Sequence, residues 1–595
     1  MYFKPFVLPF AVGVLFFFAV LIYKFVAWHW KYNKTQRRAV YKNLFTVRTL
    51  EAIWEAIREG LLHNKIWRTN PVLGYMHSSI ALGWLLLIVV SKFESWLYFG
   101  SFISRPWMGI FYRYFDIDGH RFWAEDAFNF VMDFLLLYIL SGITLAFIKR
   151  FYSRLMGMKK TTKHILYDKF ALTSLWFIFP LRLFAESATA AIHHNGGFAT
   201  QWIGDLMSLS FAQMVQLPLW WGYSIALFIF LVNLPFSRYM HIPAEIALIF
   251  SRRWGVNEMD FTTGYTKLEV NACSRCGICI DVCPLQSEAN INHIQAAYFI
   301  RDVRYHTLTG DTAQNCLMCN RCVAACPVGI ESTLIRQEYR VQTKIDKHGN
   351  YKFIDTFQSR NSIGHIIYFA GCMTHLTPSI IESMKSIFKE AGDSYWFMDE
   401  DQSVCCGRPL KQQGFFKQAY DLRTKNTELI NKSGAKTLVV SCPICYQSFK
   451  KEYGLKINIL HHSQYIQQLL DSGKIQVNKS ASKVSYHDPC ELGRACGEYE
   501  ASRKVLAHCA SLIEAPKNKK DSLCCGYNLG DAVLDLSDQM KVRDAALKNL
   551  LTFNPDSIVT ACPMCKKAFM HGNKQKVQDL AEIVAENLLH KQKLS

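Results

Sequence analysis

The sequence predicts a multidomain protein with a five-helix transmembrane bundle at its N-terminus, an α-helical domain in the middle and a duplicated α/β domain at its C-terminus. Three observations lead to this prediction. Apolar runs fall almost entirely before residue 250, all 20 cysteines lie at or after Cys273, and the cysteine spacing after residue 365 repeats once. The chain of 595 residues therefore changes both solvent and chemistry near residue 255.

Five apolar stretches are long enough to cross a bilayer, which takes about 20 residues. They lie near 5–28, 72–98, 123–148, 170–192 and 217–241. The first stretch lacks a small-residue cleavage site and is followed by further spans, so we expect a retained helix and not a signal peptide. We assign residues 1–250 to the membrane domain.

Loop charges predict the orientation of these spans. The 24–68 loop carries ten Lys and Arg residues, the 149–169 loop carries seven, and the 193–216 loop carries none. The positive-inside rule then places the N-terminus outside and the cysteine-rich half in the cytoplasm of a prokaryote, below its inner membrane. Lipid headgroups account for much of the net charge of +19, so we expect no nucleic-acid partner.

Two histidines lie at the cytoplasmic ends of predicted spans. His77 sits early in the second span and His241 at the end of the fifth. Imidazoles at one depth are suited to the axial ligation of a b-type haem, and polar groups at membrane depth usually have a function. The alternative is a pair of interfacial histidines that reach toward the headgroups.

The five spans, the outside N-terminus and these histidines resemble the cytochrome b gamma subunit of respiratory nitrate reductase. They equally resemble the membrane subunits of heterodisulfide reductase and of dissimilatory sulfite reductase-linked complexes. The two-haem nitrate reductase pattern also needs a histidine deeper in span two and one early in span five, where this chain reads Leu85-Leu86-Leu87 and Leu219-Trp220-Trp221. The resemblance therefore implies haem b, and this departure argues against a second haem of the nitrate reductase kind.

Polar residues also lie on the predicted outer side, around spans three and four. Because quinone chemistry needs proton donors beside an apolar cleft, they form a predicted quinone site. The alternatives are a second, non-standard haem site and ordinary helix capping. The residues are His120, Glu125, Asp126, Arg182, Glu186, His193 and His194.

Two runs of four cysteines share the spacing C-x-x-C-x-x-C-x-x-x-C-P. They are Cys273, Cys276, Cys279, Cys283 and Cys316, Cys319, Cys322, Cys326. This is the bacterial two-cluster ferredoxin pattern, in which the fourth cysteine of each run ligates the other cluster. We therefore predict one cubane [4Fe–4S] on Cys273, Cys276, Cys279 and Cys326, and another on Cys316, Cys319, Cys322 and Cys283. A zinc ribbon would need two C-x-x-C pairs instead. The predicted dicluster ferredoxin domain covers 251–345.

A second kind of cysteine repeat fills the rest of the chain, with copies in domains 346–475 and 476–595. Each copy has a single cysteine, an adjacent pair and a C-P-x-C motif: Cys372, Cys405, Cys406, Cys442, Cys445 in the first, and Cys490, Cys524, Cys525, Cys562, Cys565 in the second. Apolar β-rich runs precede the key cysteines, so we expect α/β units with cysteines in loops at strand ends.

Five thiols in each copy exceed the four that a cubane needs. The surplus predicts an unusual cluster, or one that opens to bind a thiol, and makes Cys405, Cys406, Cys524 and Cys525 candidate catalytic residues. The alternative is one structural cysteine per copy, because free cysteine packs as a small apolar side chain. Cys496 and Cys509 fall outside the motif and are expected to be structural.

The repeat resembles the two-copy cysteine-rich domain of heterodisulfide reductase catalytic subunits, most clearly in His487-Asp488-Pro489-Cys490-Glu-Leu-Gly-Arg494. That resemblance implies one or two further [4Fe–4S] clusters, cubane or noncubane, and disulfide chemistry. Related domains occur in the iron–sulfur subunits of glycolate, lactate and glycerol-3-phosphate oxidases. They also occur in membrane proteins that connect electron transfer flavoprotein with menaquinone.

The order of segments predicts a membrane-bound oxidoreductase that passes electrons between a soluble cytoplasmic partner and the (mena)quinone pool through iron–sulfur clusters and haem b. No Gly-rich dinucleotide fingerprint is evident, so flavin or nicotinamide chemistry would belong to a partner, with electron transfer flavoprotein the first candidate. The alternatives are a quinol-linked heterodisulfide or thiol–disulfide reductase, and a wiring subunit without chemistry of its own.

Overall fold

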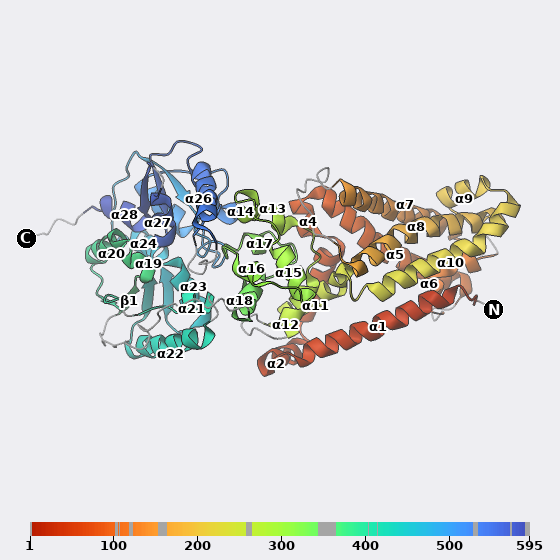
Figure 1. Cartoon of the computed structure of the whole chain (residues 1–595), viewed down its shortest axis with the longest axis horizontal. Coiled ribbons are helices and arrows are strands. Elements are labelled where there is room, and N and C mark those ends of the chain that lie inside the picture. Colours follow the sequence, from red (N-terminus) through yellow and green to blue (C-terminus); the bar gives the residue numbers. More distant parts are fainter. Residues whose placement is uncertain are drawn as a thin grey trace, which may run out of the picture. The chain divides into compact units, whose positions relative to one another are not determined.

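The computed structural model describes most of the chain and divides it into two compact units. The described residues are 3–100, 105, 107–117, 123–152, 164–256, 264–342, 365–402, 404–412, 415–527, 534–571 and 574–589. One unit comprises Met1–Gly277 and the other Ile278–Ser595 (Figure 1).

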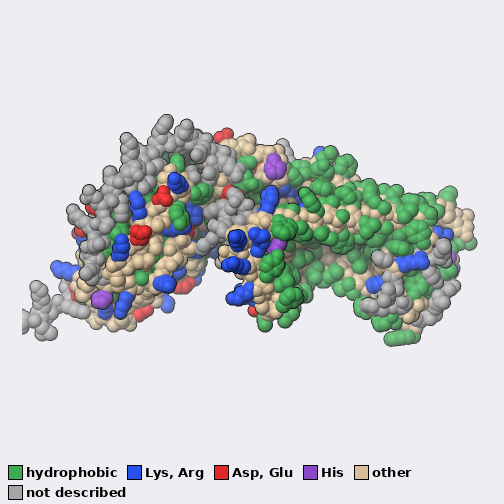
Figure 2. Space-filling model, turned by 90° about the horizontal axis from the view of Figure 1, so that it is seen from below, with side chains coloured by type: hydrophobic (Ala, Val, Ile, Leu, Met, Phe, Trp, Pro, Cys, Tyr) green, Lys and Arg blue, Asp and Glu red, His purple; other side chains and the backbone are tan. Residues whose placement is uncertain are grey.

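Five helices of the first unit are long and apolar enough to cross a membrane: α1 (Val7–Trp30), α5 (Pro71–Phe99), α7 (Glu125–Phe151), α8 (Leu166–His193) and α10 (Leu209–Asn233). Helix α8 packs on α10, α5 on α7, and α1 on α10. Hydrophobic side chains cover most of the visible face over these helices (Figure 2). The five-helix bundle predicted from the sequence is confirmed.

Short helices lie between and after the long ones. They are α2 (Lys34–Asn43), α3 (Val47–Glu55), η1 (Ala56–Leu61), α4 (Asn64–Thr69), α6 (Met108–Phe115), α9 (Phe198–Asp205), η3 (Arg238–Met240), α11 (His241–Arg253) and α12 (Gly264–Ala272). Local sequence also sets the limits of the long helices. Helix α5, for example, begins where the Asn70 side chain accepts a hydrogen bond from the Leu73 backbone N–H and Pro71 occupies the first helical position.

The fifth span ends eight residues earlier than its predicted limit of 241. Pro235 has no N–H with which to continue the helix, so α10 ends at Asn233 and the chain turns through η3. His241 therefore begins the short helix α11 and does not end a span, which corrects its predicted place.

In the N-terminal part of the second unit, the regular elements among the described residues are all helices. It contains α13 (Ile278–Asp281), α14 (Pro284–Ser287), α15 (Ala296–Arg304), α16 (Gly310–Gln314), α17 (Arg321–Ala324) and α18 (Ser332–Gln342). Two buried arginines of α18 connect this helix with other segments of the helical part. Arg336 donates to the Ile294 carbonyl at 2.7 Å, and Arg340 donates to the Gln314 carbonyl at 2.7 Å and the Cys316 carbonyl at 3.0 Å.

Two four-stranded parallel sheets form the rest of the second unit. The first has the order β2-β1-β3-β4, with β1 (Ile366–Phe369), β2 (Tyr395–Phe397), β3 (Thr437–Val440) and β4 (Asn458–His461). The second has the same order, β6-β5-β7-β8, with β5 (Lys483–His487), β6 (Ser511–Ile513), β7 (Ser557–Thr560) and β8 (Lys576–Asp579). The predicted duplicated α/β domain is confirmed.

Helices cover both sheets, and the two copies share one hydrophobic core. The first copy contributes α19 (Cys372–His375), α20 (Pro378–Ala391), α21 (Arg408–Gln412), α22 (Phe416–Lys432), α23 (Pro443–Glu452) and α24 (His462–Asp471). The second contributes α25 (Ala501–Cys509), η5 (Lys519–Asp521), α26 (Leu536–Leu550), α27 (Pro563–Met570) and α28 (Leu580–Glu586). Helix α20 packs on α28, and α24 on α25.

Candidate redox sites

The cysteines of each α/β copy gather at the carboxyl ends of its two central strands. In the first copy, Cys372 follows β1 and Cys442 follows β3; in the second, Cys490 follows β5 and Cys562 follows β7. Connections leave these strands toward opposite edges of the sheet, so the cysteines lie at its topological switch point. Parallel α/β sheets bind their ligands at this position, because the diverging loops leave a crevice there.

Each C-P-x-C motif lies at the start of a helix. Cys442 is the N-cap of α23 and Pro443 its first residue, and Cys562 and Pro563 have the same places in α27. Proline fits the first helical turn because no intrahelical partner is needed there. The unpaired N–H groups of such a turn favour negative charge, which suits cysteines that bind iron as thiolates.

The first copy leaves space around its cysteines by having glycine before Cys372. Gly371 has φ +88°, and a Cβ there would come 2.9 Å from the Cys445 sulfur and 3.0 Å from the Cys442 Cβ. The buried Asp399 carboxylate holds this loop by accepting hydrogen bonds from the Ala370 N–H at 2.8 Å and the Gly371 N–H at 2.6 Å. The crowding at Gly371 fits a cluster held by the surrounding thiols.

The Gly371→Ala substitution should therefore remove the cluster of the first copy. A Cβ would collide with the ligands and would also require a left-handed conformation that costs about 1–2 kcal/mol for other residues. The expected result is a loss of about four of the about sixteen irons of a four-cluster protein, measured by iron and sulfide analysis after anaerobic purification.

Gly392→Ala is the matched control, because Gly392 also has positive φ (+68°) but no atom lies within 4 Å of its Cβ position. Equal iron content in the two variants would show that Gly371 is not part of a cluster site.

In the second copy, four of the five predicted ligands line one cavity: Cys490, Cys525, Cys562 and Cys565. Leu317 of the ferredoxin part and Ile444 of the first copy complete part of its wall. The remaining cysteine, Cys524, is also buried. The sequence repeat is thus matched in space, because each copy brings its cysteines to the carboxyl ends of the central strands of its own sheet.

The adjacent cysteine pairs are alike in the two copies. Hydrogen bonds from Cys405 and Cys445 lower the pKa of the Cys406 thiol, and bonds from Cys524 and Cys565 lower the pKa of Cys525 in the same way. The second cysteine of each pair is therefore the better thiolate, and the two pairs share one local arrangement.

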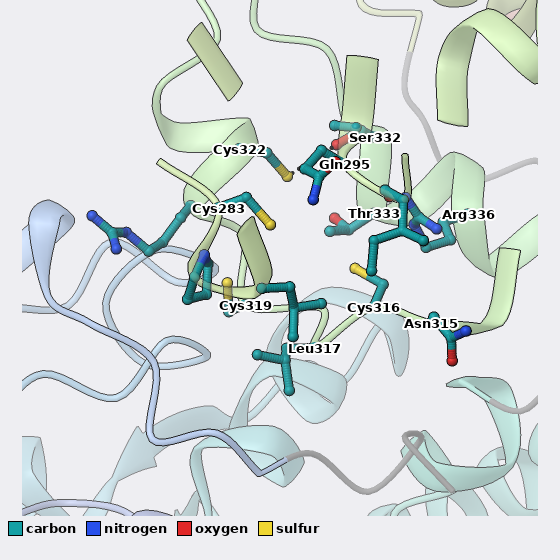
Figure 3. Close-up of a pocket in the computed structure, with 15 residues that line it drawn as sticks. Cys283, Gln295, Asn315, Cys316, Leu317, Cys319, Cys322, Ser332, Thr333 and Arg336 are labelled. Atoms are coloured by element: carbon teal, nitrogen blue, oxygen red, sulfur yellow. Dashed lines mark hydrogen bonds between the residues drawn. The ribbon is translucent and has the colours of Figure 1, made fainter. Parts of the chain in front are cut away.

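Four cysteines of the ferredoxin part line another cavity, shown in Figure 3: Cys283, Cys316, Cys319 and Cys322. These are the cysteines predicted to hold the second cubane. Burial raises the pKa of the Cys322 thiol to about 12, so an occupying iron cluster would be needed to keep it deprotonated. The donor set fits a [4Fe–4S] cubane.

The loop that carries Cys273 and Cys276 is held by charged groups of the first unit. Arg275 forms a 2.5 Å ion pair with the buried Asp168 at the start of α8. Asp168 also accepts a 2.6 Å hydrogen bond from the Arg238 N–H, and the Arg238 guanidinium donates to the Ser274 carbonyl at 2.6 Å. The start of α8 and the short helix η3 therefore fix the backbone of this loop. Cys279 and Cys326 belong to the second unit, so the first cubane remains a prediction.

The same region contains the predicted haem histidines and a third histidine. His241 Nδ1 donates to the Arg238 carbonyl at 2.8 Å, and His63 Nδ1 donates to the Leu61 carbonyl at 2.9 Å. The His63 and His77 rings lie 5.4 Å apart, and His241 lies within electrostatic range of His77. An Nδ1–H bond to a carbonyl is usual for metal-bound histidine, since it orients the ring so that Nε2 ligates. These contacts are of the kind that a haem ligand makes, and haem ligation by His77 and His241 stays a prediction.

A buried cluster of charges, which we name the outer cluster, contains part of the predicted quinone site. Arg182 Nε pairs with Glu186 Oε1 at 2.9 Å, and Arg113 pairs with Glu94 at 2.8 Å. The outer cluster comprises Glu94, Arg113, Asp116, Glu125, Arg182 and Glu186, all buried and electrostatically linked through Glu94 and Arg182. The cluster contains four carboxyl groups and only two guanidinium groups. Because the carboxyl groups outnumber their positive partners, some of them can carry a proton.

The other residues predicted for the quinone site are not part of the outer cluster. His194 is exposed as the left-handed C-cap of α8, and His193 is half-buried at the end of that helix. Asp126 is exposed beside Glu125 in the first turn of α7. His120 lies outside the described residues. Sequence reasoning missed Glu94, Arg113 and Asp116, although a glutamate inside an apolar span was a visible signal.

Comparisons with known proteins agree with these sites. The cysteine-rich domain family (CCG) matches residues 366–450 and 484–570, and the 4Fe-4S dicluster domain family matches 269–330. The chain is similar to the EtfAB:quinone oxidoreductase of Syntrophomonas wolfei, with 24% identity over 87% of this chain and 88% of that protein.

Two other relatives cover different shares of the chain. One is a subunit of the dihydromethanophenazine:CoB–CoM heterodisulfide reductase of Methanosarcina barkeri, which is 27% identical over 54% of this chain and 78% of its own length. The other is the probable iron-sulfur-binding oxidoreductase FadF of Bacillus subtilis, which is 22% identical over 78% of this chain and 83% of its own length.

Fold, sites and relatives together define a membrane-associated iron–sulfur oxidoreductase. More particularly, a match to the 4Fe-4S dicluster domain precedes two matches to the cysteine-rich CCG domain, and this part of the chain is similar to the heterodisulfide reductase subunit. The resemblance inferred from the cysteine motifs is confirmed.

Proposed function

We propose that this protein passes electrons between a soluble cytoplasmic electron transfer flavoprotein and the (mena)quinone pool, through iron–sulfur clusters and haem b. The observation that carries the proposal is the similarity to EtfAB:quinone oxidoreductase, which extends over both the membrane helices and the cysteine-rich half. The orientation proposed from loop charge, with the N-terminus outside a prokaryotic inner membrane, exposes the cysteine-rich half to such a partner.

The contacts of Arg238 support haem as the membrane carrier beside the loop of Cys273 and Cys276. Its carbonyl accepts the bond from His241, and its guanidinium binds the Ser274 carbonyl between Cys273 and Cys276. One residue thus joins a proposed haem ligand to the loop of a proposed cubane. Haem, when bound, supplies one-electron chemistry that quinone and iron–sulfur clusters can both use.

We expect His77→Ala and His241→Ala each to abolish the same reduced b-type absorbance, because both would ligate one iron. His63→Ala should retain it, although His63 also bonds a carbonyl and stacks on His77. Difference spectra of purified variants check this. Loss of the haem in His63→Ala, with retention in His241→Ala, would make His63 the ligand.

The outer cluster supports a quinone site at the other ends of the spans. Quinone reduction takes up protons together with electrons, and buried carboxyl groups paired with arginine can hold and pass them. Three of the residues predicted for the quinone site belong to this cluster, namely Glu125, Arg182 and Glu186, together with Glu94, Arg113 and Asp116.

The proposal is tested by an anaerobic assay. Reduced electron transfer flavoprotein and a menaquinone analogue are mixed with the purified membrane protein. Flavin oxidation coupled to quinone reduction is expected. No quinone reduction by a protein with full iron and haem content would contradict the flavoprotein as partner.

A second candidate, quinol-linked reduction of a heterodisulfide, is favoured by one observation. Cys372 is exposed, whereas the other four predicted ligands of the first copy are buried, so a thiol substrate can approach that side. The same assay with a disulfide in place of the flavoprotein separates the two functions.

A further inference from the structure

One arginine connects the second cubane site with the second cysteine-rich copy. Arg494 Nε donates to the Cys319 carbonyl at 2.7 Å, and its Nη1 donates to the carbonyls of Ser522 at 2.9 Å and Lys520 at 3.3 Å. Arg494 follows Cys490 by four residues, and Ser522 precedes Cys524 by two. A single guanidinium group therefore joins three loops that carry predicted cluster ligands.

The cysteines of these loops are also in contact. Cys319 and Cys524 are buried in one apolar cluster, against which Cys283 and Cys490 pack. Leu317 lines both the cavity of the second cubane and the cavity of the second copy. The two cavities are thus neighbours that share a wall.

The first copy has no matching arginine. Leu376, which follows Cys372 by four residues as Arg494 follows Cys490, is 57% exposed. Beside the cavity of the second copy, the first copy contributes Ile444 to the cavity wall and Arg408, which forms a 3.8 Å ion pair with Glu491. The second copy therefore stands next to both the ferredoxin cavity and the first copy.

The charge of Arg494 is partly uncompensated by hydrogen bonds. Its Nη2 is buried and has no hydrogen-bond partner among the described residues. A buried positive charge attracts electrons toward adjacent clusters bound by thiolates, because the low dielectric of the interior weakens screening. Hydrogen bonds from a neighbouring residue to ligand loops also fix ligand orientation.

We propose that Arg494 is a positioning residue that holds the second cubane against the second cysteine-rich copy, which makes this copy the point where electrons pass between the ferredoxin domain and the cysteine-rich domain. This inference rests on the proposed electron-transfer function. It names the order within that path: second cubane, second copy, first copy.

The test uses the full-length protein in detergent, loaded with its clusters. Arg494→Gln removes the charge and Arg494→Lys keeps it while losing the forked hydrogen bonds. Leu376→Ala, at the equivalent position of the first copy, is the matched control. Iron content is measured first; then a photoreductant pulse injects electrons, and freeze-quench EPR follows the second cubane and the cluster of the second copy.

We expect Arg494→Gln to slow transfer from the second cubane to the second copy by about 10–100-fold. It should also weaken the magnetic coupling between the two reduced centres. Arg494→Lys should retain its iron and show a smaller slowing, and Leu376→Ala should behave as the parent. If Arg494→Gln loses iron, Arg494→Lys decides the matter by its rate and coupling.

Unchanged coupling and rate in an iron-replete Arg494→Gln or Arg494→Lys protein would overturn the inference. Equal slowing in Leu376→Ala would overturn it as well. The readout needs neither quinone nor flavoprotein, so a wrong partner assignment would fail in turnover assays and leave this result unaffected.

Discussion

Serine in place of Cys405 or Cys524 should abolish turnover with the soluble partner while quinol-driven reduction of the haem persists. The second cysteine of each adjacent pair lies beside the last cysteine of its C-P-x-C motif, Cys406 beside Cys445 and Cys525 beside Cys565. Loss of one thiol leaves the cluster incomplete, whereas the haem and the ferredoxin cubanes depend on other residues. Paired assays, one for haem reduction and one for full turnover, measure the effect.

Cys496→Ser is the control for these variants, because Cys496 is a half-buried cysteine outside the repeated motif. It should retain both activities. Retained turnover in both pair variants would show that this domain is structural and that the partner exchanges electrons with the cubanes. Loss of haem reduction together with turnover would show that the adjacent cysteine pairs are needed for folding.

Glu186→Gln should lower quinone-dependent turnover by about 10²–10⁴-fold, the usual contribution of a general acid or base. Glutamine preserves the shape of the side chain and can still accept the hydrogen bond of Arg182, but it carries no exchangeable carboxyl proton. The rate of cluster reduction by the soluble partner should stay unchanged. Steady-state turnover with a menaquinone analogue, alongside rapid-mixing reduction of the clusters, measures both quantities.

Asp133→Asn is the matched control, since Asp133 is a buried acid of the neighbouring helix α7. Its carboxylate is occupied by the N–H groups of Ala199 and Thr200 at 2.8 and 2.9 Å, which cap the start of α9. Equal effects of the two substitutions on quinone turnover would mean that the outer cluster supports packing and not proton transfer.

Much of the architecture was predictable because its signals are local in sequence. The first four spans agree with their predicted limits to within four residues, since about 20 apolar residues have few alternatives to a membrane helix. Equal cysteine spacings predicted the duplication, and both copies have the same strand order. The fifth span was misplaced although Pro235 was visible as a helix-ending residue.

The contacts between distant residues were not predictable in this way. Glu94 and Arg113 pair across 19 positions, and Arg494 reaches the Cys319 carbonyl across 175. Such pairs depend on how helices and loops pack, which periodicity and spacing do not determine. His63 was missed for the same reason, because it approaches His77 only after the chain turns between η1 and α4.

The central claim is that one chain carries electrons between quinone and its cysteine-rich copies by way of the second cubane. In the most direct measurement, fully reduced protein is mixed with a menaquinone analogue, and the oxidation of the haem and of the clusters is followed by freeze-quench EPR. We predict that haem oxidises first and the clusters of both copies afterwards, and that Cys283→Ser, which removes a ligand of the second cubane, blocks oxidation of the copies but not of the haem. Oxidation of the copies at an unchanged rate in that variant, or copies that stay reduced in the parent protein, would contradict the account.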